Sequence, residues 1–401
     1  MKLMVLSHAL IQREAQARWR KLVKSGTHQV RLVVPKRWVV NWFGVEQILE
    51  GCDEEIDGLA VKTLSTTSES NLSYYFFRRL GRELREFDAD VIFPTHESNQ
   101  TIQMVLWRWF FSRRSRLVFF TMSEHKRLAP PVSLHPRHLL GYCWRKIAWG
   151  LLCHGSDAAV CHYPRIKEQM RREGYNRPIL IQTQIGVDED LFRPDIRDRE
   201  GMRTKLGLNG FVVGFVGRIT LEKGILDIAE AIGHLPTDTV LFVVGDGPDR
   251  DRLKNMALKS GWEKRLHLTG VVSPSEVAAY MRAMDCFVLG SRTTEGWVDT
   301  FPNVVAQAMA TGLPVVGSNS GAIPFMLGDR GLLFQEGSVD EIVDHLTNLR
   351  IDGTLRLRMG ESLRERALSE FCVGGINGSL IEFFQSVVRK GNPNISGQNR
   401  G

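Results

Sequence analysis

The sequence has little of what marks secreted, metal-binding or membrane-spanning proteins. Its six cysteines are scattered over 401 residues, with no CxxC pair and no histidine at ligand spacing. Neither a disulfide framework nor a zinc site is therefore predicted. No apolar run reaches the roughly 18 residues that a spanning helix needs. The opening MKLMVLSH is too short an apolar run for a signal peptide and predicts a first strand. These absences favour a cytoplasmic protein with reduced thiols.

Acidic residues are scarce in one part of the chain. Residues 101–150 contain nine basic side chains and one acidic residue, Glu124. Residues 1–190 contain 28 basic and 20 acidic groups, a balance of +8, whereas the whole chain carries +7. The basic surface is therefore expected on the first half of the protein.

Aromatic residues interleave with these basic groups. The aromatic set is Trp107, Trp109, Phe110, Phe111, Trp144 and Trp149, and the basic set is Arg108, Arg113, Arg114, Arg116, Arg145 and Lys146. This combination suits an anionic membrane surface, and a nucleic acid would also accept it. A core helix with a solvated basic edge would give the same pattern without a ligand. A membrane surface is the partner we expect for residues 101–150, and we expect no nucleic acid.

Short β-branched runs alternate with amphipathic helical stretches, which is typical of a parallel sheet wrapped by helices. Strands are predicted at 2–8, 29–35, 90–96, 116–122, 158–163 and 179–186, with helices at 13–26, 71–87 and 164–174. A second series is predicted at 211–218, 239–247, 265–270, 286–290, 313–319 and 331–334, with last helices near 355–371 and 378–390. The fold class is therefore α/β, with two doubly wound, Rossmann-like domains.

A charged, poorly periodic segment at 188–203 is the predicted linker. It separates an N-terminal domain, residues 1–190, from a C-terminal domain, residues 191–375. Residues 376–401 are expected to form a C-terminal helix that packs back on the first domain, followed by a disordered tail. Open α/β sheets bind ligands beyond the carboxyl ends of their strands, and two such domains would face each other across a cleft.

Two cations follow the first strand of the second domain. In GRITLEKG, Gly217 and Arg218 end the strand and Lys223 precedes a helix. A planar guanidinium and a movable ammonium together suit a diphosphate. A pair of surface cations in a loop is the alternative.

The next strand ends in GDGP. Gly245 and Gly247 resemble half of a dinucleotide fingerprint, but Arg250 stands where its third glycine should be, and no acidic ribose partner follows at the usual distance. The motif is therefore weak evidence for a nucleotide and poor evidence for NAD.

Residues 299–316 read DTFPNVVAQAMATGLPVV and place Asp299, Asn303 and Gln307 one helical turn apart on one edge of a helix. Thr300, Phe301 and Pro302 lead into that helix. Its first free N–H groups, near Asn303, suit phosphate oxygens. After the next strand, the small-residue loop 317–321 allows close backbone approach to a ligand.

The order of GR-x4-KG, GDGP and the 299–316 stretch resembles the donor domain of family 4 glycosyltransferases of GT-B fold. The resemblance extends over nearly the whole chain, through MKLMVLSH at the start and IGVDEDLFRP between the domains. It implies a retaining transfer of a sugar from a nucleotide diphosphate sugar, with no metal and no other cofactor.

The resemblance also assigns roles to individual residues. Arg218 and Lys223 match the pair that neutralises the departing diphosphate. Asp299 falls on the first carboxylate of an E-x7-E motif, which holds the donor sugar, and Gln307 falls on the second, which holds ribose. Both depart from glutamate, and Glu295 is a candidate to assist.

The first domain departs further from this family. SHALIQRE follows the first strand where many relatives carry a Gly-Gly loop, so Ser7, His8 and Gln12 are candidates for rebuilding the phosphate cradle. Many relatives also have a histidine near the reacting sugar. His125, beside Glu124, and His96, on the acceptor side, are the two candidates here, and a surface role is the alternative for each.

The predicted function is a retaining glycosyltransferase in cell-surface polysaccharide or glycolipid synthesis, with a saccharide or lipid-linked acceptor. It is expected in the cytoplasm, as a peripheral protein of the inner membrane face. A GT-B nucleotide-sugar epimerase and a catalytically decayed nucleotide-sugar-binding protein are the two alternatives.

Overall fold

The computed structural model describes residues 1–42, 45–71, 75–96, 99–111, 114–122, 136–295 and 297–390. The chain forms two compact units. Unit 1 comprises Met1–Ile185 and Asn377–Gly401, and unit 2 comprises Gly186–Ile376. The chain therefore leaves unit 1 after residue 185 and returns to it inside helix α14 (Val373–Lys390). The boundaries predicted from the sequence stood at 190 and 375.

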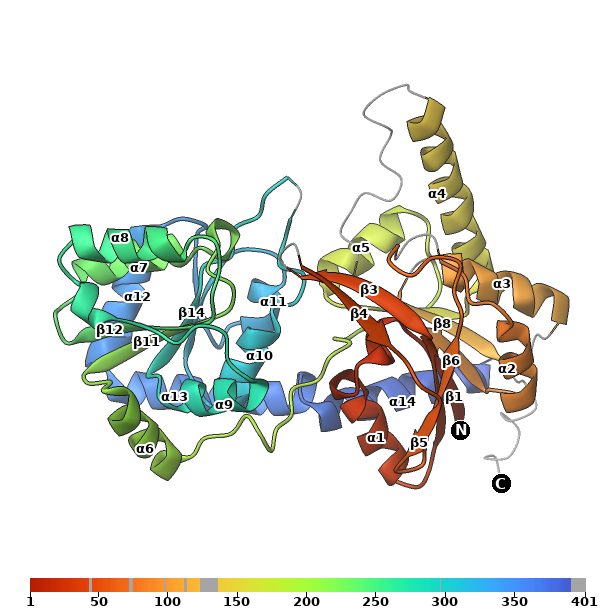
Figure 1. The fold of residues 1–401 in the computed structure, drawn as a ribbon, viewed down its shortest axis with the longest axis horizontal. Helices are drawn as coiled ribbons and strands as arrows, with labels where there is room; N and C mark the ends of the chain where they lie inside the picture. Colours follow the sequence, from red (N-terminus) through yellow and green to blue (C-terminus); the bar gives the residue numbers. More distant parts are fainter. Residues whose placement is uncertain are drawn as a thin grey trace. The chain divides into compact units, whose positions relative to one another are not determined.

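Unit 1 is built on an eight-stranded sheet of order β10-β9-β8-β7-β1-β2-β6-β5 (Figure 1). Its strands are β1 (Lys2–Leu6), β2 (Gln29–Pro35), β5 (Glu54–Ile56), β6 (Leu59–Leu64), β7 (Val91–Pro94), β8 (Arg116–Thr121), β9 (Ala158–Cys161) and β10 (Ile179–Ile181). Every pairing in it is parallel except β5 with β6. Strands β3 (Arg37–Trp42) and β4 (Val45–Glu50) form a separate antiparallel hairpin.

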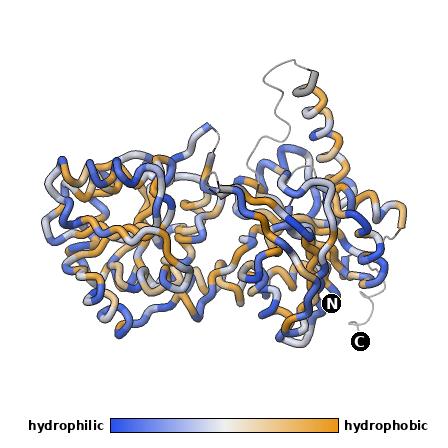
Figure 2. Tube along the Cα trace, in the orientation of Figure 1, coloured by the Kyte–Doolittle hydropathy of each residue, from blue (hydrophilic) through white to orange (hydrophobic). Residues whose placement is uncertain are grey.

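Helices cover this sheet and place its core. They are α1 (Ala17–Lys24), α2 (Leu80–Phe87), α3 (Asn99–Phe111), α4 (Pro136–Gly155) and α5 (Pro164–Arg172), with 3-10 turns η1 (Ala9–Ile11) and η2 (Glu14–Gln16). The central strands are buried along nearly their whole length, as expected for a parallel sheet covered on both faces. In Figure 2 the strands are drawn mostly as hydrophobic. Phe384 of α14 joins this core, with its ring centroid 5.2 Å from that of Phe93.

Unit 2 has a six-stranded parallel sheet of order β13-β12-β11-β14-β15-β16. The strands are β11 (Phe211–Val216), β12 (Thr239–Val244), β13 (Leu266–Leu268), β14 (Cys286–Leu289), β15 (Val315–Ser318) and β16 (Leu332–Phe334). The helices are α6 (Ile196–Leu206), α7 (Ile225–His234), α8 (Arg250–Lys259), α9 (Pro274–Arg282), α10 (Asn303–Ala310), α11 (Ile323–Leu327), α12 (Val339–Ile351) and α13 (Gly353–Glu370), with 3-10 turns η3 (Leu221–Lys223) and η4 (Glu263–Arg265). Helix α7 packs with α8 and α12, and α10 packs with α11 and α13; Figure 1 draws these two groups on opposite sides of the strands. This is the doubly wound arrangement that the sequence predicts.

Each sheet has one point where the strand order reverses. In unit 1 it lies between β1 and β7, and in unit 2 between β11 and β14, because successive strands leave these neighbours in opposite directions. The loops that leave the carboxyl ends of two such strands diverge and make room for a ligand. These two switch points are therefore the places to examine for a site.

The prediction of elements was correct for the sheets and wrong in three places. All twelve predicted strands are present, but strands β3 to β6, between residues 37 and 64, were not predicted. Helix α2 begins only at Leu80, although a helix was predicted from residue 71. The predicted linker at 188–203 overlaps helix α6, which begins at Ile196. Asp195 is the N-cap of this helix, and its side chain accepts from the backbone N–H of Asp198 at 3.1 Å.

A buried imidazole makes the stability of unit 1 depend on pH. His162 follows β9 with its ring 4.8 Å from Phe120, and burial lowers its pKa to about 3. The unfolded chain protonates His162 near pH 6.5, whereas the folded chain does not. The contribution of His162 to the free energy of unfolding is therefore fully present above pH 6.5 and is lost as the pH falls toward 3. Between pH 7 and pH 5, the free energy of urea unfolding should fall by about 1–2 kcal/mol more in the wild type than in His162→Phe. Equal pH dependence in both proteins would contradict this.

Candidate functional site

Loops from β11 and β14 touch at the switch point of unit 2. A Cβ on Gly224, whose φ is +65°, would lie 1.9 Å from the carbonyl oxygen of Gly290. Only a glycine permits this approach, because a side chain would overlap a backbone carbonyl that cannot move aside. Lys223 comes directly before this contact, so the contact fixes where its side chain begins.

Lys223 and Asp299 form an ion pair at this edge of the sheet. The Nζ atom of Lys223 lies 2.6 Å from Oδ2 of Asp299, and their side chains are only 17% and 10% exposed. The hydroxyl of Ser291 donates to the same oxygen at 2.8 Å. The ammonium also lies 5.0 Å from the ring centroid of Trp297. The sequence assigned Lys223 and Asp299 to one site, and the structure brings them together.

The backbone of Asp299 is held as firmly as its carboxylate. Its carbonyl oxygen accepts from the N–H of Ala322 at 3.0 Å, and a Cβ on Gly321 would lie 2.1 Å from that oxygen. The hydroxyl of Ser318 donates to the carbonyl of Ser291 at 2.6 Å. The small-residue loop 317–321 thus packs against the loop that carries Asp299.

Arg218 and Glu295 are exposed at the same edge. The pKa of Glu222 lies below its usual value, first because its own backbone N–H bonds the carboxylate, with a further contribution from the charge of Arg218. Arg218 therefore lies near Glu222.

The stretch that leads into α10 adopts the geometry expected from its sequence. Pro302 is the N-cap, and Asn303 begins the helix. Phe301 is buried with its ring 5.6 Å from Phe371, and Thr300 is half-buried. Asn303 and Gln307, one turn apart, are half-buried, as is Val304, whereas the other residues of the helix are buried. This polar edge of an otherwise buried helix agrees with the predicted spacing.

The glycines of the GDGP motif allow two loop backbones to pack closely. A Cβ on Gly245 would lie 2.0 Å from the carbonyl oxygen of Gly217, and one on Gly247 would lie 2.4 Å from that of Ile219. Arg250 begins α8 and bonds Asp246 at 2.7 Å. These glycines therefore allow the loop after β12 to pack against the loop after β11.

The switch point of unit 1 contains two histidines. His96 follows β7, and its ring centroid lies 6.4 Å from that of His8, which follows β1. Burial, and to a smaller degree His96, lower the pKa of His8 to about 4, so His8 is neutral near pH 7. The His8 ring also packs against two aromatic rings, with its centroid 5.2 Å from that of Trp38 and 6.5 Å from that of Tyr75. His125, the other predicted histidine, lies outside the described residues.

Four residues at these edges escaped the prediction. Ser291 and Trp297 lie between β14 and Asp299, and the tryptophan two positions before a predicted site carboxylate was the available signal. Trp38 and Tyr75 come from the segment between residues 37 and 79, where the strands were not predicted and no motif marks either residue.

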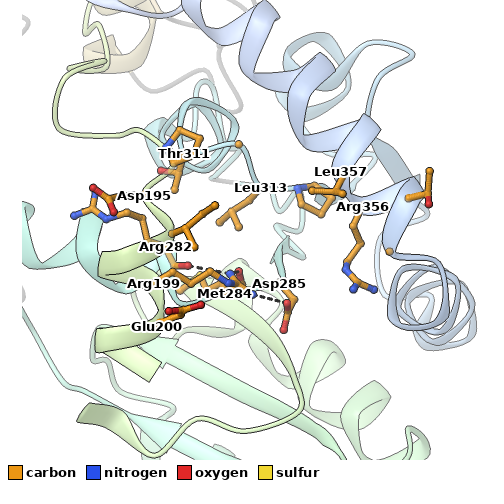
Figure 3. Close-up of a pocket in the computed structure, with 16 residues that line it drawn as sticks. Asp195, Arg199, Glu200, Arg282, Met284, Asp285, Thr311, Leu313, Arg356 and Leu357 are labelled. Carbon is orange, nitrogen blue, oxygen red and sulfur yellow. Dashed lines mark hydrogen bonds and ion pairs between the residues drawn. The ribbon is translucent and has the colours of Figure 1, made fainter. Parts of the chain in front are cut away.

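A cavity of about 630 Å³ lies at the opposite edge of the unit 2 sheet (Figure 3). Its lining includes Asp285 and Pro314, which immediately precede β14 and β15. Arg199 bonds Asp285 at 2.6 Å, and Arg282 donates to the carbonyl of Leu191 at 3.0 Å. Arg199 thus ties α6 to the residue that precedes β14, and Arg282 ties α9 to the segment that leads into α6. Because these cations are used in contacts between elements of unit 2, we do not place the site there. Among the described residues, no three metal-ligating side chains lie close enough together to hold an ion.

Comparison with known structures shows the fold. The whole chain has the GT-B fold: HepE of Anabaena, solved in complex with UDP, superposes with a TM-score of 0.70 over 96% of this chain and 100% of that one, at 18% identity. WaaG, a glycosyltransferase involved in lipopolysaccharide biosynthesis, superposes with a TM-score of 0.60 over 94% of this chain and 98% of its own, at 17% identity.

Residues 198–366, which lie within unit 2, match the family model of glycosyl transferases group 1. The D-inositol 3-phosphate glycosyltransferase of Corynebacterium glutamicum is 30% identical over 227 residues, 53% of this chain and 52% of the relative. The lipopolysaccharide core biosynthesis glycosyltransferase LpsE of Rhizobium meliloti is 26% identical over 234 residues, 58% and 65%. The chain thus aligns with only about half to two thirds of these relatives.

Proposed function

We propose that this protein is a metal-independent, retaining glycosyltransferase that takes its sugar from a nucleotide diphosphate sugar. The observation that carries the proposal is the ion pair of Lys223 with Asp299, 2.6 Å apart at the switch point of unit 2. Its position is where open α/β sheets bind ligands.

The pair gives each partner a separate task. An ammonium has three N–H donors, and Asp299 takes one of those of Lys223, so others remain for the oxygens of a departing diphosphate. Arg218, exposed on the same loop, adds a second charge. Asp299, held by Ser291 and Lys223, presents a fixed carboxylate to hydroxyls of the donor sugar. Stabilising the charge that develops on the leaving group is the largest contribution we expect to the rate.

We assign the remaining contacts with the nucleotide sugar to the start of α10 and to its polar edge. Thr300, Asn303 and the first turn of the helix would meet phosphate oxygens, and Gln307 would bond ribose. Glu295, exposed beside Trp297, is a second ribose candidate. Phe301 and Pro302 set the entry of the helix. Gly217, Gly245 and Gly247 allow the loops after β11 and β12 to pack closely beneath the donor.

For the acceptor, we propose a saccharide or a lipid-linked saccharide of the cell envelope, received by unit 1. The name of the relative LpsE refers to lipopolysaccharide core biosynthesis, which fits this class. His96 with its neighbour His8 is our candidate for contacting the reacting groups, and His125 is kept as a second. None of the described helices combines the length and apolarity that crossing a bilayer requires. We propose a peripheral position on the inner membrane face.

A donor screen tests the proposal. The protein is incubated with a panel of nucleotide diphosphate sugars and lipid extracts, and products are detected by their mass increase. A hexose added to a lipid or saccharide, with EDTA present, is the expected result. An epimerised donor without any acceptor would indicate an epimerase, which the named transferase relatives do not favour. Calorimetry that finds no binding of any nucleotide diphosphate would indicate a decayed site.

Gln307→Glu should preserve or increase donor affinity. A carboxylate accepts hydrogen bonds from both ribose hydroxyls, whereas an amide has a single acceptor oxygen. An added hydrogen bond to a charged group contributes about 1.5 kcal/mol, equal to roughly tenfold in Kd. Calorimetry with the donor found in the screen measures this. A folded Gln307→Glu protein that no longer binds donor would show that Gln307 does not face ribose.

A further inference from the structure

The structure separates the basic and aromatic residues of 101–150 into inward and outward groups. Arg108 and Arg116 both bond Asp157, at 2.9 and 3.3 Å, so their charges are used inside unit 1. Trp149 is 5% exposed, and its indole donates to the carbonyl of Glu173 at 2.8 Å. These residues hold the fold together and are not part of an outer surface.

The N-terminal half of α4, by contrast, presents apolar side chains to solvent. Leu140 is 70% exposed, Ile147 56%, Leu139 45% and Trp144 38%, and Cys143 is also exposed. At about 100° per residue these five positions share an arc of roughly 140° on the helix. A continuous apolar face of this kind is far from the scattered single residues usual on a protein surface.

The other side of the same helix is basic. Arg145 and Lys146 are exposed outside the apolar arc, and no Asp or Glu occurs in α4. Hydrogen bonding to Tyr142 raises the pKa of Lys146, which is therefore cationic at neutral pH. At about 100° per residue, Lys146 lies about 20° beyond the edge of the apolar arc, whereas Arg145 lies on the opposite side of the helix. An apolar face bordered by a positive charge, with a basic opposite face, is the pattern of a helix that lies in the plane of an anionic bilayer.

The helix is anchored at its far end, so this face is presented as part of a rigid element. Besides the Trp149 bond, Gly155 packs so closely on Val105 of α3 that a Cβ there would lie 2.2 Å from a methyl group. In Figure 1 the N-terminal half of α4 extends beyond the other helices of unit 1, and Figure 2 draws much of the helix as hydrophobic.

We infer that the exposed face of α4, formed by Leu139, Leu140, Cys143, Trp144 and Ile147, inserts into the interface of a bilayer rich in anionic phospholipids. Lys146, at the margin of this face, would meet the headgroup phosphates. A second copy of this chain is a poorer occupant, because its own α4 would bring an identical set of positive charges to the contact. The inference rests on the proposed position at the membrane, and it assigns membrane binding to α4.

Vesicle flotation of the full chain tests this inference. The wild type should bind vesicles of phosphatidylcholine mixed with phosphatidylglycerol, and bind vesicles of phosphatidylcholine alone more weakly. Leu140→Asp should weaken binding by about tenfold or more, because an inserted leucine is lost and a charge repels the headgroups. Leu258→Asp on α8, at a leucine that is 63% exposed, is the matched control and should bind like the wild type. Lys146→Glu should weaken binding only to the anionic vesicles.

Three results would overturn the inference. They are no preference of the wild type for anionic vesicles, equal binding by Leu140→Asp and wild type, and equal losses in Leu140→Asp and Leu258→Asp. Sedimentation velocity without vesicles identifies the rival, since a dimer that Leu140→Asp dissociates, with no vesicle binding, would assign this face to a second copy. Nucleotide binding, measured by calorimetry on the same samples, should be unchanged in every variant. Failure at α4 therefore stays distinguishable from failure of the transferase proposal.

Discussion

Lys223→Ala is expected to lower turnover by about a hundredfold or more, the usual loss when one group that stabilises developing charge is removed. The ammonium is placed by the contact of Gly224 with Gly290 and by its ion pair with Asp299. Single-turnover measurements with the donor identified by the screen isolate the transfer step from product release. Turnover close to that of the wild type would remove Lys223 from the mechanism.

The variant also leaves the Asp299 carboxylate without its cation in a mostly buried place. Breaking such a pair costs stability, by about 1–3 kcal/mol after allowance for the partial exposure of Lys223. Urea unfolding separates this effect from lost catalysis, provided that rates are measured where both proteins are fully folded. Lys254→Ala, which removes an exposed cation of α8, should change neither rate nor stability appreciably. Donor affinity should fall less than turnover, because the charge is needed most as the diphosphate departs.

Much of the candidate site was accessible from the sequence because its residues lie in the loops that follow strands. Lys223 and Asp299 are 76 positions apart, yet each could be placed at a strand end, and parallel strands bring their carboxyl ends to one edge. The sequence did not predict that the two side chains bond each other. That contact depends on the loop packing of Gly224 against Gly290, a pairing of glycines that no local pattern reveals.

The fold was predictable where strands are buried on both faces. Runs such as FVVGFV and TVLFVV are apolar throughout, so they stand out from the helices around them. Strands β6 and β5 are the last two at one edge of the unit 1 sheet, with half-buried and charged positions that weaken this signal, and β3 and β4 form a separate hairpin. The helix predicted from residue 71 fails in its first half because that segment pairs instead, through a bridge of Phe77 with Thr66. Such long-range pairing overrides local helical propensity.

Gly224→Ala should lower both the stability of unit 2 and its affinity for the donor, because the added methyl group does not fit the backbone geometry. The residue has a φ of +65°, which costs a residue with a side chain about 1–2 kcal/mol. Its new Cβ would also lie 1.9 Å from the Gly290 carbonyl oxygen, and relieving that overlap requires the β11 and β14 loops to separate. Together we expect the free energy of unfolding of unit 2 to fall by roughly 2–5 kcal/mol.

The same separation should move Lys223 away from Asp299 and weaken donor binding by about tenfold or more, since preorganised groups lose most when they shift. Gly201→Ala is the matched control: it lies inside α6 with nothing within 4 Å of the added Cβ, so it should raise stability by about 0.5–1 kcal/mol and leave donor binding unchanged. Urea unfolding and calorimetry measure both quantities in both proteins. If Gly224→Ala kept wild-type stability and donor affinity, the loops could not be in the contact on which the placement of Lys223 depends.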